Sequence, residues 1–187
     1  MSGDLYTARE AITAGIKSAL PELRTCETHG GRFDRGELQR LSRRAPAVFV
    51  AALGVPSVAE TPRAGLPLVG WAAFVIVSDT PQVSRDVIAL DYAEALLRLI
   101  NDNGKGHRWG LDGAQKPERL AADNLYSGSL DKMRVAMWAV TWRQGIHLTP
   151  GAISELADFA LYSATHLVGG SEDPDAEDRV ELPTEPE

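Results

Sequence analysis

The chain has 187 residues, of which 44% are hydrophobic and 24% are charged, and its formal net charge is -7. These values are ordinary for a globular protein, and the length suits one domain better than two. A single cysteine excludes an internal disulfide. The most apolar stretches are about a dozen residues long, shorter than the roughly 20 residues of a membrane-spanning helix, so we expect no membrane span.

The negative charge gathers at the C-terminal end. Residues 170–187 contain eight acidic residues and one basic residue, so the rest of the chain is neutral overall. Because this segment is also rich in proline and poor in apolar residues, we expect it to be disordered. The sequence therefore predicts a single domain over residues 1–168 and an acidic tail over residues 169–187. The tail is interpreted either as a solubilising segment or as a docking segment for a basic surface, and the neutral body does not favour nucleic-acid binding.

The first part of the chain predicts two helices and a strand. Residues 4–20 place apolar side chains three and four positions apart, which is typical of an amphipathic helix, and Pro21 ends it. Residues 23–28 are a short strand candidate. Asp34, followed three residues later by a glutamate, predicts a capping box for a helix over residues 35–44.

Two apolar strands follow. Residues 47–53 predict a buried strand, and residues 54–65 predict an exposed hairpin connection because they are polar and contain prolines. Residues 68–77 are apolar at nearly every position and rich in valine, isoleucine and aromatic residues. We expect this strand to lie centrally with both faces covered.

The second half predicts a long helix and further strands. Asp79-Thr80-Pro81 is a typical helix start, and apolar periodicity continues to about Asn103. A polar loop over residues 104–117 comes next. Strands are then expected over residues 120–126, 133–144 and 156–166, with a turn at residues 127–129. The predicted fold class is α/β (α+β): a largely antiparallel sheet flanked by an N-terminal helix and one long central helix.

Residue patterns for catalysis or metal binding are weak. Cys26 and His29 are a conceivable thiol and base, but a separation of three puts them on opposite faces of a strand. The four histidines lack the spacing of a zinc site. The glycine-containing loop of residues 104–110 lacks the Lys-Ser/Thr pair of a phosphate-binding loop and follows a helix. We therefore expect no catalytic residues, no cofactor and no metal.

Three segments of the sequence, taken together, resemble a family of small structural proteins encoded in the tail-gene region of Mu-like phages and prophages. They are Arg-Ala-Pro-Ala-Val-Phe-Val at residues 44–50, His-Arg-Trp-Gly-Leu at residues 107–111, and Asn-Leu-Tyr-Ser-Gly at residues 124–128 running into residues 136–144. The resemblance covers roughly residues 5–150 and does not include the acidic tail.

Such proteins are similar in predicted organisation to phage tail terminators, whose α/β sandwich forms a hexameric ring. The resemblance implies that the protein caps the tail tube, stops its polymerisation and joins it to the head connector, with DNA passing through the ring. Its partners would be further copies of itself, the tail tube protein and a head–tail connector protein. It would be assembled in the bacterial cytoplasm and lie at the head-proximal end of the virion tail. The alternatives are a neck adaptor of the same virion and, in another class, a small hydrolase or nucleotide-binding enzyme.

A ring of this kind needs two different contact patches on each subunit. We hypothesise that Arg108 and Trp109, in the polar loop, anchor one contact with a neighbouring subunit. Trp109 has the alternative of folding back on its own domain. The segment from Asn124 to Asp131, including Tyr126, is expected to shape a second contact.

Overall fold

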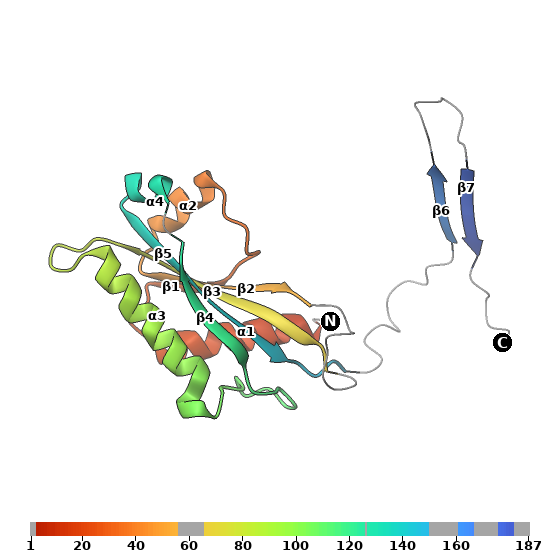
Figure 1. Cartoon of the computed structure of the whole chain (residues 1–187), viewed down its shortest axis with the longest axis horizontal. Coiled ribbons are helices and arrows are strands. Elements are labelled where there is room, and N and C mark those ends of the chain that lie inside the picture. The colour runs from red at the N-terminus through yellow and green to blue at the C-terminus, as the bar shows by residue number, and fades with distance from the viewer. Residues whose placement is uncertain (1–2, 56–65, 126, 150–160, 167–175, 182–187) are drawn as a thin grey trace. The chain divides into compact units, whose positions relative to one another are not determined.

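The computed structural model describes residues 3–55, 66–125, 127–149, 161–166 and 176–181. The chain divides into two compact units, Met1–Thr149 and Pro150–Glu187. The first unit contains a five-stranded sheet with the strand order β1-β2-β3-β5-β4 (Figure 1). Its strands are β1 (Thr25–Thr28), β2 (Ala47–Gly54), β3 (Leu68–Ser78), β4 (Glu118–Asn124) and β5 (Val135–Gly145), and its helices are α1 (Asp4–Ala19), α2 (Arg35–Ser42), α3 (Arg85–Asn101), the short 3-10 helix η2 (Asp102–Gly104) and α4 (Gly128–Lys132).

The sheet is largely antiparallel, which confirms the predicted α+β class. The pairs β2–β3, β3–β5 and β5–β4 are antiparallel, and the pair β1–β2 is parallel. A parallel pair cannot be joined by a tight hairpin, and here α2 lies in the connection between β1 and β2.

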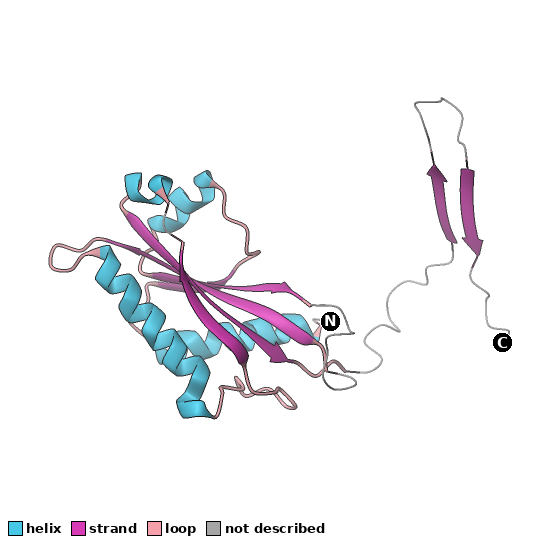
Figure 2. Ribbon diagram, viewed as in Figure 1, coloured by secondary structure: helices cyan, strands magenta, loops and turns pink. Residues whose placement is uncertain are grey.

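The first face of the sheet is covered by the two long helices α1 and α3 (Figure 2). Ile12 and Ile16 of α1 and Leu96 and Ile100 of α3 are completely buried against it. Trp71 of β3 lies in the same core. The apolar side chains of both helices are therefore buried, as their periodicity in the sequence predicts, because the apolar side of each helix packs on the first face of the sheet.

The second face is covered over part of its length by the short helices α2 and α4. Leu41 of α2 and Leu130 of α4 pack in one cluster with Phe49, Ile76 and Met137 of the sheet. β3 is therefore buried from both sides, as predicted, and only its residues Gly70 and Ser78 are partly exposed. Toward the end of the sheet where β2 ends and β3 begins, no described helix covers this face.

Most expected boundaries lie within about two residues of those in the structure, and two expected features differ more clearly. The long helix begins at Arg85 and not at residues 79–81, because Thr80 forms a turn with Val83 through its hydroxyl and backbone. Asp79 still acts as a cap, since its Oδ1 accepts a hydrogen bond from the backbone N–H of Arg85 at 3.0 Å. The turn expected at residues 127–129 overlaps α4, which begins at Gly128. Part of the expected connection over residues 54–65 lies outside the described residues.

In the second unit, β6 (Leu161–His166) and β7 (Ala176–Glu181) pair antiparallel. β6 corresponds to the strand expected over residues 156–166, of which the first five residues are not described. β7 occupies six residues of the acidic segment. The domain boundary after residue 168 and the tail after it stay predictions.

The predicted cap of α2 is present and can be tested. Asp34 Oδ1 accepts a hydrogen bond of 2.8 Å from the backbone N–H of Glu37. We expect Asp34→Ala to lower the free energy of unfolding by about 1 kcal/mol, because one amide of the first turn loses its acceptor. Asp34→Asn keeps an acceptor and should cost much less. Urea unfolding of both variants measures the difference, and equal losses would contradict the assignment.

Candidate functional site

Cys26 and His29 lie on different sides of the sheet, as their spacing predicts. The Cys26 thiol is buried with α1 in the first core and contacts the carbonyl oxygen of Thr13 at 3.5 Å. The His29 ring stacks on Phe33, and its Nε2 lies 2.9 Å from Glu37 Oε1. Burial raises the pKa of the Cys26 thiol to about 11, so the thiol is protonated at neutral pH. A thiolate–imidazole pair is therefore not formed by these two residues.

The glycine-containing loop after α3 uses its backbone amides to close the helix. The N–H groups of Lys105, Gly106 and His107 donate to the carbonyl oxygens of Asp102, Asn101 and Ile100. Donors engaged in this way at the carboxyl end of a helix are not available to a phosphate group.

The part of the chain that the structure describes contains no group of three or more histidine, cysteine or acidic side chains placed to hold a metal ion. Within the same residues, no helix has the length and apolar character needed to cross a membrane.

Trp109 is folded back into its own subunit. Its side chain is only 7% exposed and belongs to the core formed with α1 and α3. A Cβ added to Gly15 of α1 would stand 2.8 Å from Cε3 of the Trp109 ring, so the glycine makes room for the indole. The hypothesis that Trp109 anchors a contact with a neighbour is corrected accordingly: the indole fills the space between the loop and α1.

Gln144 holds the Trp109 loop to the sheet. Its Oε1 accepts hydrogen bonds from the indole nitrogens of Trp109 at 2.9 Å and Trp142 at 3.3 Å. Its Nε2 donates to the carbonyl oxygens of His107 at 2.9 Å and Gln115 at 2.7 Å. Because a glutamine side chain has two donors and two acceptor positions, all of its capacity is used.

The importance of Gln144 was missed in the sequence. The only available signal was its position, since it continues the strand face of Trp138 and Trp142 and is therefore a polar side chain at a core position. Gln144 is completely buried, and nothing in the local sequence indicates its partners in the loop.

The other residues proposed for contacts lie at separate places. Arg108 is exposed and its Nε donates to the carbonyl oxygen of Ala114 at 3.1 Å. Asn124 is exposed at the end of β4, opposite Trp138. Asp131 is exposed on α4. Tyr126 lies outside the described residues.

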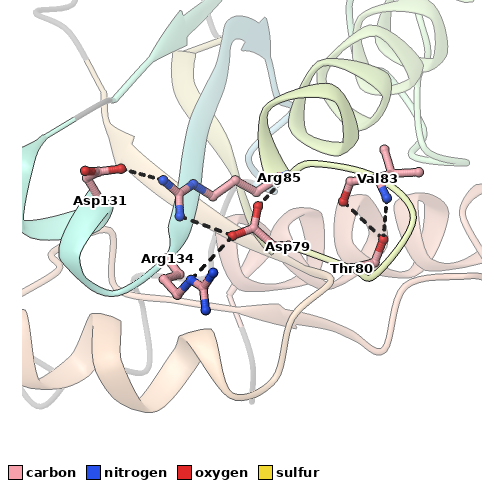
Figure 3. Close-up of polar contacts among 6 residues, drawn as sticks. All are labelled: Asp79, Thr80, Val83, Arg85, Asp131 and Arg134. Atoms are coloured by element: carbon pink, nitrogen blue, oxygen red, sulfur yellow. Dashed lines mark hydrogen bonds and ion pairs between the residues drawn. The ribbon is translucent and has the colours of Figure 1, made fainter.

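Asp131 takes part in a network of charges that ties α4 to the start of α3 (Figure 3). The Arg85 guanidinium lies between the carboxylates of Asp131 and Asp79, with 3.4 Å from Nη1 to Asp79 Oδ2. Arg134 Nε lies 3.9 Å from the same oxygen. Arg85 is the least exposed member of the network, and the other three side chains are more exposed. Because exposed ion pairs contribute about 0–1 kcal/mol each, the network orients the two segments more than it stabilises the fold.

An open hollow lies where none of the described helices covers the second face of the sheet. Its volume is about 420 Å³, and the ends of β2, β3, β4 and β5 line it. Gly70 contributes no side chain, and Leu53 and Val55 are 53% and 45% exposed. We call this surface the sheet hollow and define it by Leu53, Gly54, Val55, Gly70, Arg119 and Arg143.

A second apolar surface lies on α3. Val87 and Leu90 are 49% and 52% exposed and lie three positions apart on the outer side of the helix, beside the exposed acids Asp91 and Glu94. Val83, in the turn before the helix, is 40% exposed. We call these five residues the α3 ridge.

The described unit is thus a small α+β subunit with two exposed apolar surfaces. No protein-family model matches the chain. The chain is 28% identical over 189 residues to the Mu-like prophage FluMu protein gp37 of Haemophilus influenzae, covering 94% of this chain and 89% of that protein. This similarity confirms the resemblance to Mu-like prophage proteins, and it supports a structural or morphogenetic role in a phage.

The Gln144 network predicts a large effect on stability. Gln144→Leu would leave two indole N–H groups and two carbonyl oxygens without this partner in a buried place. We expect the free energy of unfolding to fall by at least about 2 kcal/mol, because each unpaired buried group costs about 1–3 kcal/mol. Tryptophan fluorescence during urea unfolding measures this. Gln39→Leu, at an exposed position of α2, is the matched control and should change little; similar values for both variants would refute the role.

The buried thiol predicts a pH dependence of stability. Burial raises the Cys26 pKa from 9.0 to about 11, so the folded protein holds this proton more strongly than the unfolded chain. The corresponding stabilisation is complete below pH 9 and is lost as the pH rises toward about 11. We expect the free energy of unfolding to fall less between pH 9 and about pH 11 in the Cys26→Ala variant than in the unmodified protein, as urea unfolding at the two pH values measures. An identical loss in the two proteins would contradict this expectation.

Proposed function

We propose that the protein is a phage tail terminator, which forms a ring on the last subunits of the tail tube, stops tube polymerisation and joins the tube to the head connector. The observation that carries the proposal is the similarity over nearly the whole chain to a Mu-like prophage protein. The resemblance of the sequence to tail-region proteins supports a place in the tail, and the likeness to tail terminators implies a ring of six copies. The role is structural and needs no catalytic residue.

The surface of the subunit supports a role in assembly. Of the eight large apolar side chains that are exposed among the described residues, five lie in the sheet hollow or the α3 ridge. Clustered exposed apolar surface is typical of sites that contact other proteins. A ring requires two different patches on each subunit, and these two surfaces supply such a pair.

The charge distribution supports the same role. Residues 1–169 are neutral overall, so the subunit body lacks the general positive charge of proteins that bind DNA tightly. A ring that lets DNA pass through has to avoid tight binding to the phosphate backbone. The acidic residues after 169 would add repulsion toward DNA wherever they face the channel.

The proposal is tested by adding the purified protein to polymerising tail tube protein of the same prophage. We expect rings at one end of the tubes by electron microscopy, and we expect the mean tube length to stop increasing once the ends are capped. An equal amount of heat-unfolded protein is the control. Tubes that continue to lengthen, without rings at their ends, would contradict the proposal. Binding to the portal-side connector without binding to tubes would favour the neck adaptor.

A further inference from the structure

We infer that the α3 ridge of one subunit inserts into the sheet hollow of a second copy of the same chain, so that subunits join head to tail. This inference rests on the proposed ring function and names the surfaces that form the ring. Both surfaces are built from described residues of the same unit, and each is apolar at its centre.

The two surfaces differ in shape. The sheet hollow is concave and its floor includes backbone, since a Cβ added to Gly70 would come within 3.5 Å of the Gly54 carbonyl oxygen. The α3 ridge is the convex outer side of a helix, with Val87 and Leu90 as its large side chains. A helix side laid into an apolar hollow is a common mode of protein recognition.

The charges of the two surfaces are opposite. Arg119 and Arg143 line the sheet hollow, and no acidic side chain is among its described lining residues. Arg143 lies opposite Glu118 of β4, so Arg119 is the cation on which the charge complementarity rests. The α3 ridge carries Asp91 and Glu94, and Asp86 is exposed one position before Val87. Glu94 forms an ion pair with Arg98 one turn further along the helix, so Asp86 and Asp91 provide the excess negative charge. Apolar centres bordered by opposite charges favour this pairing and disfavour the pairing of either surface with itself.

One subunit cannot bring its own two surfaces together. α3 packs on the first face of the sheet, whereas Leu53 and Arg143 lie at the uncovered part of the second face. The α3 ridge begins beyond Ser78, the last residue of β3, and the hollow contains Gly70 near the start of that strand. The eight steps along β3 from Gly70 to Ser78 span about 26 Å. The contact must therefore be made between different copies, and a repeated head-to-tail contact closes into a ring when its rotation allows.

The test uses two single variants, each of which damages one surface. Leu90→Asp removes the centre of the α3 ridge, and Leu53→Asp removes the apolar border of the sheet hollow. Both side chains are more than half exposed, so folding should be kept, which circular dichroism checks. Tyr6→Asp, at a 50% exposed position of α1 outside both surfaces, is the matched control.

We expect each variant alone to self-associate about 30-fold more weakly than the unmodified protein in sedimentation velocity, as central contact residues do. A mixture of the two variants should form heterodimers and nothing larger, because the intact ridge of Leu53→Asp fits the intact hollow of Leu90→Asp and no second contact remains. The Tyr6→Asp protein should associate normally.

Three results would overturn the inference. They are a monomeric unmodified protein at every concentration, variants that associate like the unmodified protein, and a mixture of the two variants that stays monomeric. The proposed function is judged separately, by whether the unmodified protein caps tail tubes. Normal caps formed by both variants would refute this contact and leave the tail terminator role in place.

Discussion

The five-stranded sheet has two apolar faces, but among the described residues only two long helices are present to cover them. α1 and α3 both pack on the first face. The second face is left to the short helices α2 and α4, which reach only part of it. The uncovered remainder is the sheet hollow. The surface available for assembly is therefore a direct consequence of how helices are distributed over the sheet.

A second consequence of this arrangement is the way in which the long loop after α3 is held. The loop returns from α3 to the sheet edge and inserts Trp109 beside Gly15 of α1. A buried indole nitrogen needs an acceptor, and Gln144 provides it while also binding two loop carbonyl groups. One side chain thus fixes a loop that has little regular structure of its own, which keeps this end of the subunit in one conformation.

The proposed assembly uses elements that are not needed to fold the subunit. Val87 and Leu90 face away from the core, and the buried side of α3 is complete without them. The ion-pair network of Arg85 with Asp79 and Asp131 orients the start of α3, where the ridge begins. A subunit whose exposed contact residues are separate from its core residues can be stable alone and still present a defined surface to a neighbour.

Three features follow from local signals in the sequence: the apolar periodicity of α1, the continuous apolar run of β3, and the Asp34 cap of α2. These were predictable because helix and strand periods and caps depend on neighbouring residues. The burial of Trp109 depends on long-range contacts, because its hydrogen-bond partner Gln144 lies 35 residues away. The sheet hollow also depends on long-range contacts, since Leu53 and Arg119 come from different strands and are brought together only by the strand order β2-β3-β5-β4.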